Sequence, residues 1–345
     1  MKTRLSNATL RVALVLSTAV LGLVSQPRAA ETPNYKIVDR IKVPDGGFDY
    51  ANFDPVTGRV LMARTDFTTV IDVKTGKVSQ LNSAARGHMA MPIPGTKLLV
   101  LPQRQGTIRI TDAATDMVLA ELPGGKNPDG AVYDPVTKNV FVMNRESAEA
   151  TVVDPVARKV VATIPIGGSI EFTASDGAGK VFANDESVGD IAVIDVKALK
   201  LSGRYKMEGC MAPSGLAFVP GAKLLISSCR NGVAKVIQSD TGKEIASLPI
   251  GRGPDAVIYD ATRKLAFIPC GGDGVIEVIS LADPAHIAVV QHIQTQAGTR
   301  TGTLDPATGR LYLMASKPDP AAAPPPGGGG APRLAGSFEV LVVAP

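Results

Sequence analysis

Short apolar runs separated by polar turns recur along the chain from about residue 34 to its end. The stretch 129–168 shows one unit clearly, with apolar runs at 131–133, 140–143, 150–153 and 160–166. Runs of this length that are rich in β-branched residues and joined by short turns predict antiparallel strands. No run of ten or more residues follows a 3.6-residue period, which disfavours helical repeats.

The four-strand unit returns at a nearly constant spacing. The turn after the first run falls at Asp54, Ile93, Asp134, Asp176, Val219, Asp260 and Asp305, in steps of 39, 41, 42, 43, 41 and 45 residues. A second column of turn residues keeps the same step, at Asp72, Asp112, Asp154 and Asp195. Seven four-stranded units of about 40 residues predict an all-β fold, a single seven-bladed β-propeller.

The two ends of the repeat region predict how the ring closes. Residues 34–43 read as one strand before the first complete unit, and residues 336–343 read as a strand with no further strand after it. Pairing the N-terminal strand with the last blade would complete that blade and leave no open sheet edge at the seam. We therefore expect residues 31–345 to form one propeller.

One segment interrupts the repeat. Residues 317–336, between the second and third strands of blade seven, are dense in Pro and Gly and predict a flexible loop. The loop should emerge on the face that carries the candidate site described below. A tolerated insertion and a lid over that site are its two interpretations.

Residues 1–30 have the pattern of a signal peptide. Basic residues precede the apolar run Val12–Val24, which is short for a membrane span, and the small residues Ala29 and Ala30 follow. A retained N-terminal anchor is the alternative. The segment holds four Lys or Arg residues and no acid, so its removal would lower the formal net charge from +4 to about zero. We predict a periplasmic or secreted protein with no transmembrane span in the mature chain, and nucleic-acid binding is disfavoured because it needs a basic stripe.

Export to an oxidising compartment would allow a disulfide between two of the three cysteines. Cys210 precedes the first strand of blade five, and Cys229 ends its second strand. These strands are antiparallel and joined by a turn at Pro220–Gly221, so their far ends should meet. We predict a Cys210–Cys229 disulfide and expect Cys270, one blade later, to be a free structural thiol.

Seven equivalent positions, five residues before each turn, begin the innermost strands and should meet at one mouth of the central channel. They are Asp49, His88, Asp129, Glu171, Ser214, Asp255 and Arg300. Such a ring can bind a divalent cation, Ca²⁺ or Mg²⁺, with Asp129, Glu171 and Asp255 as possible ligands. It can also supply an acid and a base if crowding raises one pKa. Arg300 can hold an anionic group through a fork of hydrogen bonds.

A purely structural interpretation competes with this one. Asp129 and Asp255 follow Pro in the repeat, so each can simply cap a strand or bond to the neighbouring blade. His88, Glu171 and Arg300 replace the repeat residue with a chemically different one, which favours a function. On the same face, the loops after the second strands add a rim of arginines, Arg64, Arg104, Arg145 and Arg230.

The repeat sequence resembles a known family. Val152-Val153-Asp154, and Asp240-Thr241-Gly242-Lys243 followed by Ile250-Gly251, are similar to the YVTN propeller repeat. Residues 34–345 as a whole resemble the exported YncE-like β-propeller proteins. The resemblance implies a seven-bladed periplasmic or secreted propeller and supplies no catalytic motif.

Two functions follow from these observations. The first is a monomeric binding protein or scaffold that takes a small molecule or a protein at the mouth of the channel. The second is a metal-assisted hydrolase or lyase, similar in logic to propeller lactonases, that uses the carboxylate ring. The sequence has no Gly-x-Ser-x-Gly motif, phosphate loop or metal-binding His pair, and it leaves open whether the protein is an enzyme.

Overall fold

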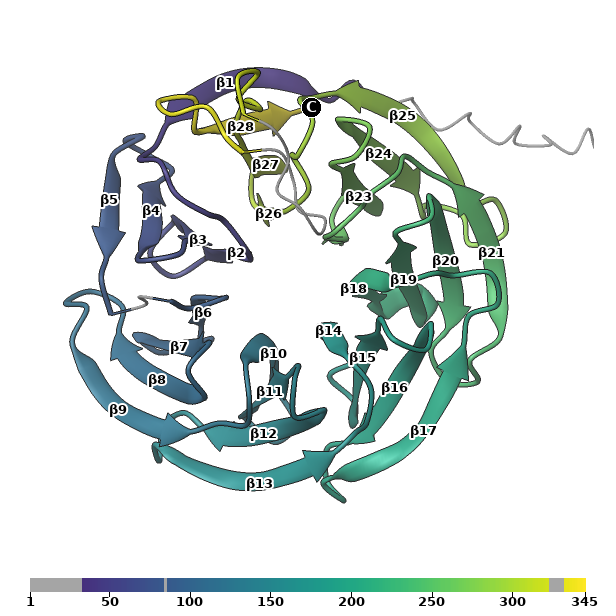
Figure 1. Cartoon of the computed structure of the whole chain (residues 1–345). Coiled ribbons are helices and arrows are strands. Elements are labelled where there is room, and N and C mark those ends of the chain that lie inside the picture. The colour runs from purple at the N-terminus through teal and green to yellow at the C-terminus, as the bar shows by residue number, and fades with distance from the viewer. Residues whose placement is uncertain (1–32, 84–85, 323–331) are drawn as a thin grey trace, which may run out of the picture. The chain divides into compact units, whose positions relative to one another are not determined.

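The protein folds as a ring of sheets. In a computed structural model, the described residues, 33–83, 86–322 and 332–345, form seven four-stranded antiparallel sheets. Figure 1 views the ring along its axis; the first strand of blades one to six lies nearest the centre, and β26 (Gly302–Asp305) takes that place in blade seven. The predicted seven-bladed β-propeller is confirmed. The predicted signal peptide and the centre of the Pro- and Gly-rich segment lie outside the described residues.

The strands have the following bounds. Blades one to three consist of β2 (Ala51–Asp54), β3 (Arg59–Ala63), β4 (Thr68–Asp72), β5 (Val78–Leu81), β6 (Met91–Pro92), β7 (Leu98–Gln103), β8 (Thr107–Asp112), β9 (Val118–Pro123), β10 (Pro128–Asp134), β11 (Asn139–Asn144), β12 (Glu149–Asp154) and β13 (Lys159–Pro165). Blades four and five consist of β14 (Ile170–Ser175), β15 (Lys180–Asp185), β16 (Asp190–Asp195), β17 (Lys200–Lys206), β18 (Pro213–Val219), β19 (Leu224–Cys229), β20 (Val233–Gln238) and β21 (Glu244–Pro249), with the 3₁₀ turn η1 (Pro220–Ala222) after β18. Blades six and seven consist of β22 (Ile258–Asp260), β23 (Leu265–Cys270), β24 (Val275–Ser280), β25 (Ala288–Gln294), β26 (Gly302–Asp305), β27 (Arg310–Ala315), β28 (Glu339–Ala344) and β1 (Lys36–Lys42).

The ends of the chain close the ring in the last blade. The order of strands in that sheet is β1-β28-β27-β26, so the N-terminal strand is the outermost one. β1 pairs antiparallel with β28, from Lys36 opposite Ala344 to Lys42 opposite Glu339. This arrangement confirms the predicted closure, and it leaves blade seven with four strands like the others.

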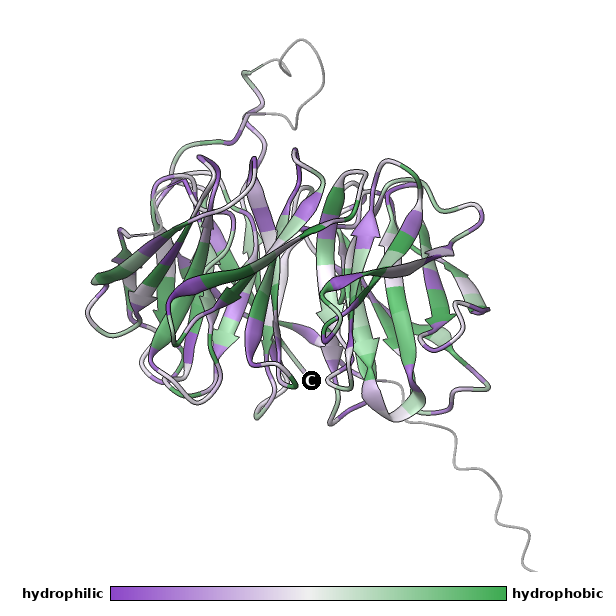
Figure 2. Cartoon of the chain, turned by 90° about the horizontal axis from the view of Figure 1, so that it is seen from below, coloured by the Kyte–Doolittle hydropathy of each residue, from purple (hydrophilic) through white to green (hydrophobic). Residues whose placement is uncertain are grey.

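The hydrophobic core lies between neighbouring sheets. The middle strands are buried on both faces, because each sheet packs against two others; β11 and β15 are almost entirely buried, whereas the outer strand β13 alternates. One cluster joins Phe141 of β11 to Val181 of β15 across blades three and four. Figure 2 shows the ring from the side, with hydrophobic residues concentrated in the strands. Burial of side chains of this size contributes about 1.5–3 kcal/mol each.

The aspartates of the two repeat columns are turn residues at the face opposite the candidate site. The carboxylate of Asp54 accepts hydrogen bonds from the backbone N–H groups of Val56 and Thr57. Asp112 does the same with Ala114 and Thr115. A side chain that satisfies the backbone of its own turn fixes the turn geometry, so the periodic Asp residues have a local structural cause.

At the other face the inner strands are irregular. In β10, β14 and β18 the pairing register shifts within a few residues of the strand start, next to Asp129, Glu171 and Ser214. Such bulges re-aim side chains near a sheet end. In the remaining blades the regular strand begins only after Asp49, His88, Asp255 or Arg300. The site residues therefore occupy backbone that departs from the regular ladder.

Candidate functional site

A cavity of about 340 Å³ opens at the mouth of the central channel, and every blade contributes a side chain to it. Six of the seven predicted ring residues line it; Ser214 is buried behind Asp255 instead. Its lining residues are Asp49, His88, Arg104, Asn127, Asp129, Arg145, Glu146, Glu171, Arg230, Asp255 and Arg300. The geometry thus brings together residues up to 251 positions apart, from Asp49 to Arg300. Whether they bind a ligand stays a prediction.

Hydrogen bonds between blades fix the starts of the inner strands around the cavity. The N–H of Tyr50 donates to the carbonyl of His88 at 3.2 Å, and the N–H of Ala256 donates to the carbonyl of Arg300 at 3.1 Å. The hydroxyl of Thr301 donates to the carbonyl of Asp49 at 3.0 Å. Because these bonds join adjacent blades, the site residues are held relative to one another by the ring itself.

On the side of blades three and four, the side chain of Arg145 contacts three acidic side chains. The guanidinium of Arg145 contacts Glu171 at 2.5 Å, Glu186 at short range and Asp129 only at 3.8 Å. Burial alone would lower the pKa of Arg145, but the charges of Glu171 and Glu186 outweigh it and raise the pKa. Arg230 also contacts Glu186, at 3.3 Å, but two guanidinium groups cannot neutralise three carboxylates, so this side of the site has an excess of acid.

That excess appears in the acid–base properties of the two buried carboxyl groups. Burial, with the neighbouring charges of Asp129 and Glu186, raises the pKa of Glu171 to about 9. Burial also raises the pKa of Asp129 to about 6, against the opposing effect of His88. The hydroxyl of Tyr50 donates to Glu171 at 3.5 Å. Burial, and then the charges of Asp129 and Glu171, raise the pKa of Tyr50 well above its ordinary value. Glu171 therefore keeps its proton at neutral pH, and its carboxyl group can donate a hydrogen bond.

His88 lies between two carboxylates on the side of blades one to three. Its Nδ1 is 2.7 Å from Asp49 Oδ2 and 3.5 Å from Asp129 Oδ1, and its Nε2 is 3.0 Å from Asn127 Oδ1. Burial lowers the pKa of the imidazole, but the bond to Asp49 and the charge of Asp129 outweigh burial and raise it. Among the described residues, donor atoms of Asp49, His88 and Asp129 are grouped within 4.8 Å of one another.

The possible metal ligands predicted from sequence, Asp129, Glu171 and Asp255, do not form that group. Glu171 is paired with Arg145. Asp255 accepts a hydrogen bond from Ser214 at 2.7 Å and contacts Arg300 at 2.8 Å. Both carboxylates therefore have partners of their own, and only Asp129 of the predicted set belongs to the metal-competent group. The bond from Ser214 bears out the alternative in which Asp255 ties its blade to the neighbouring one.

Of the four predicted rim arginines, three line the cavity and Arg64 does not. Arg64 is only 2% exposed, because its guanidinium donates to the carbonyls of Pro44, Gly46 and Gly47. The rim assignment of Arg64 is therefore wrong, and the residue supports the segment that leads to Asp49. Arg104 contacts Asp49 at 3.4 Å, and Arg230 contacts Glu186 at 3.3 Å.

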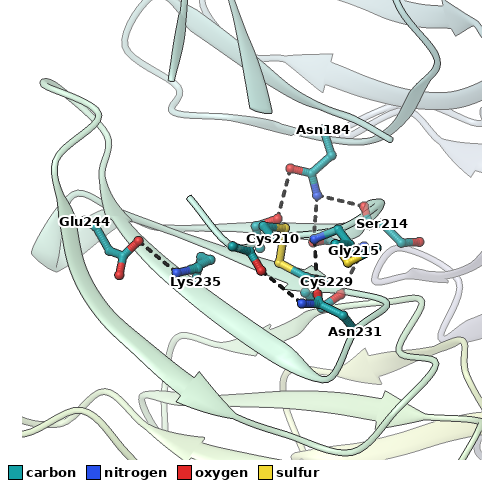
Figure 3. Close-up of a disulfide and its surroundings, with 12 residues drawn as sticks. Asn184, Cys210, Ser214, Gly215, Cys229, Asn231, Lys235 and Glu244 are labelled. Carbon is teal, nitrogen blue, oxygen red and sulfur yellow. Dashed lines mark hydrogen bonds and ion pairs between the residues drawn. A yellow bond between two sulfur atoms is a disulfide. The ribbon is translucent and has the colours of Figure 1, made fainter. Parts of the chain in front are cut away.

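A disulfide supports the loop that carries Arg230. Cys210 and Cys229 are bonded, with their Cα atoms 5.4 Å apart, which is the pairing predicted from the hairpin (Figure 3). Next to it, Asn231 donates to the carbonyl of Gly209 at 2.9 Å. The segment before β18 is thus tied to the β19–β20 turn that presents Arg230 to the cavity. Within the described chain Cys270 is free and buried, and burial raises its pKa to about 12, which makes it an unreactive thiol.

Three residues of the site were not singled out from the sequence. Asn127 and Glu146 line the cavity, and Glu186 holds Arg145 and Arg230 from behind. Asn127 precedes the Pro-Asp pair at the start of β10, and Glu146 follows Arg145 in the β11–β12 loop. Asn127 and Glu146 are close in sequence to predicted site residues, which could have drawn attention to them. The repeat, however, has no recurring residue type at their positions.

Comparisons with known proteins agree on the fold and do not identify a family. No family model matches the chain, and no curated protein matches it in sequence. A solved structure of hydrazine synthase from Kuenenia stuttgartiensis is similar to this chain, with a TM-score of 0.69 and 15% identity over 79% of this chain and 94% of that one. A chain of a mitotic checkpoint complex is similar with a TM-score of 0.72 and 13% identity over 95% of this chain and 99% of that one. At such low identity the likeness shows the propeller fold alone.

In the residues that the structure describes, no helix is long and apolar enough to cross a membrane.

Proposed function

We propose that the protein binds a small anionic molecule at the mouth of its channel. The observation that carries the proposal is the difference in exposure between acids and bases in the cavity. The side chains of Arg104, Arg230 and Arg300 are 56%, 59% and 50% exposed, whereas those of Asp129 and Glu171 are 4% and 9% exposed. A molecule that enters from solvent therefore meets guanidinium groups first.

The chemistry of the arginines favours carboxylate or phosphate groups. A guanidinium offers a planar fork of donors that matches the two oxygens of such a group. The contacts of Arg104 and Arg230 with acids are 3.4 Å and 3.3 Å long, so these side chains retain donor capacity for a ligand. A cavity of about 340 Å³ is also at the small end of the range for small-molecule sites, which favours a small molecule over a protein partner.

Calorimetric titration with citrate, succinate and inorganic phosphate tests the proposal. We expect at least one of these anions to bind and glucose, the neutral control, not to bind. Arg300→Gln and Arg230→Gln should each weaken binding by about tenfold, as expected for the loss of one charge-assisted contact. Arg252→Gln is the matched control, because Arg252 is exposed and paired with Asp273 outside the cavity. Equal weakening by all three substitutions, or binding of none of the anions, would refute the proposal.

A metal-assisted hydrolase or lyase is the second candidate, and the grouping of Asp49, His88 and Asp129 favours it. These residues would hold the ion, which when bound can polarise a carbonyl or phosphoryl oxygen. The exposed arginines would orient an anionic substrate beside it. Hydrolysis of a lactone or ester probe that depends on both a divalent ion and His88 would establish the enzyme; binding without turnover would favour the binding protein.

We also propose that the protein is an exported, monomeric member of the YncE-like group. The signal-peptide pattern of residues 1–30 and the repeat motifs support this part of the proposal, and the Cys210–Cys229 disulfide is in keeping with an oxidising compartment. Fractionation of cells that express the full chain tests export, since a processed protein should appear outside the cytoplasm. A full-length protein that stays in the cytoplasm would contradict it.

A further inference from the structure

We propose that Asp49, His88 and Asp129 form a binding site for one divalent transition-metal ion. The inference goes beyond anion binding, and the metal-assisted alternative would require it. The three side chains come from blades one, two and three, and their donor atoms face one another within 4.8 Å. Nothing in the repeat pattern requires an imidazole between two carboxylates at this position.

The strongest observation for a cation is the state of Asp129. Its side chain is 4% exposed and lines the cavity, yet among the described residues no donor forms a hydrogen bond with it. The closest charged atoms are His88 Nδ1 at 3.5 Å and Arg145 Nη1 at 3.8 Å. A buried carboxylate that accepts no direct hydrogen bond is incompletely satisfied. A metal ion bound to Asp129 would supply the direct contact that neither of these two cations makes.

The imidazole of His88 is oriented so that Nδ1, the nitrogen that faces the two carboxylates, could bind a metal. The Nε2 atom is 3.0 Å from Asn127 Oδ1, so the Nε2–H group donates to the amide oxygen. Nδ1, which is 2.7 Å from Asp49 Oδ2, is the nitrogen that would bind the metal, with the ion displacing its proton. Metal-bound histidines usually donate their second ring N–H to an oxygen in this way, which fixes the tautomer. Asn127 is therefore a positioning residue in this proposal and does not touch the ion.

The type of donor indicates the type of ion. One imidazole nitrogen with two carboxylate oxygens suits Zn²⁺, Mn²⁺ or Co²⁺ better than Ca²⁺, which takes six to eight oxygen ligands. Bond lengths of about 2.0–2.2 Å to the ion place donor atoms roughly 3.0–3.5 Å apart. The separation between His88 Nδ1 and Asp129 Oδ1, 3.5 Å, already has this value, whereas that between His88 Nδ1 and Asp49 Oδ2, 2.7 Å, would have to widen slightly.

Arg104 opposes the ion in the present arrangement. Its Nη2 is 3.4 Å from both Asp49 Oδ2 and His88 Nδ1, so its charge would repel a cation bound between them. The side chain is more than half exposed and can turn toward solvent. Removing its charge should therefore strengthen metal binding, which is the opposite of what loss of a purely structural residue would do.

Calorimetric titration of the tag-free protein with Zn²⁺ tests the proposal, with His286→Ala and His292→Ala as the background that removes the other two histidines. We expect one equivalent of Zn²⁺ to bind. Asn127→Ala should weaken binding by about 10–100-fold, and Asp129→Asn and His88→Gln should each weaken it further. Arg104→Gln should tighten it. Ca²⁺ should not compete.

Several results would overturn the site. Zn²⁺ binding that survives both Asp129→Asn and His88→Gln would locate the metal elsewhere, and so would loss of binding in the background variant alone. Because a substitution at a buried residue can unfold the protein, the unmodified protein gives a second readout. In spectra of histidine-labelled protein, Co²⁺ should shift the resonances of His88 and leave those of His286 and His292 in place; the reverse pattern would refute the proposal. Anion binding without metal binding would refute this inference and leave the proposed function intact.

Discussion

The carboxyl groups at the two faces of the ring differ in the hydrogen-bond donors available to them and in their burial. At the far face, Asp112 accepts hydrogen bonds from the backbone N–H groups of Ala114 and Thr115, and these bonds lower its pKa. At the mouth, burial and nearby acids raise the pKa of Glu171 and Asp129. A carboxylate whose own turn provides hydrogen-bond donors therefore has a structural role. A carboxyl group that the fold buries with too few donors is available for chemistry.

The largest effect should come from removing Arg145, the guanidinium that contacts three of the mouth acids. We expect Arg145→Gln to lower the free energy of unfolding at pH 8 by about 2–4 kcal/mol, because Asp129 and Glu186 lose a partner in a largely buried position. Arg252→Gln, which breaks a fully exposed pair with Asp273, should change the free energy of unfolding little. Urea denaturation measures both, and equal losses would remove the distinction between the two kinds of carboxylate.

A smaller effect of unusual sign should come from Glu171. Its pKa is higher in the folded protein than in the unfolded chain, so the folded state binds an extra proton and stability falls as pH rises from about 4.5 toward 9. Glu171→Gln removes this dependence and should stabilise the protein at pH 8 by about 1–3 kcal/mol, with little change at pH 4. Melting temperatures across this pH range measure it. A variant that is less stable than the parent at pH 8 would contradict the account.

The smallest effect should come from the far face, with the opposite dependence on pH. Asp112 has a pKa below the ordinary value, so its contribution is present at neutral pH and is lost as pH falls through the folded-state pKa. Asp112→Ala should therefore lower the melting temperature slightly at pH 7 and not at pH 2. The same series of melting curves gives the result, and a variant that matches the parent at pH 7 would show that the turn bonds contribute nothing.

The fold was predictable because its cause is local and repeated. Aspartates that fix turns, such as Asp54 and Asp112, recur at the blade period, and the middle strands read as continuous apolar runs. The closure of the ring by β1 followed from an unpaired strand at each end of the repeat. The Cys210–Cys229 pairing followed from hairpin geometry in the same way.

Most residues that line the site could be predicted from the sequence, but the contacts between their side chains could not. The position of each residue in its blade predicts that its side chain lies at the mouth. Its ion-pair or hydrogen-bond partner, however, depends on which side chains of other blades extend toward it. Glu171 was expected among the metal ligands and is instead held by Arg145. Arg64 was expected on the rim and is drawn inward by carbonyl groups of residues 44–47, a segment with its own course ahead of β2. Neither contact is visible in the repeat pattern.

The most direct test of the account is a carboxyl-carbon NMR titration of the protein, with Glu171→Gln and Asp129→Asn used to assign the two mouth resonances. The account predicts that Glu171 titrates well above its ordinary value, that Asp129 titrates near pH 6, and that Asp112 titrates below its ordinary value in the same spectra. If Glu171 and Asp129 titrate with the ordinary pKa values of exposed carboxylates, the mouth has no excess of buried acid, and the distinction between the two faces fails.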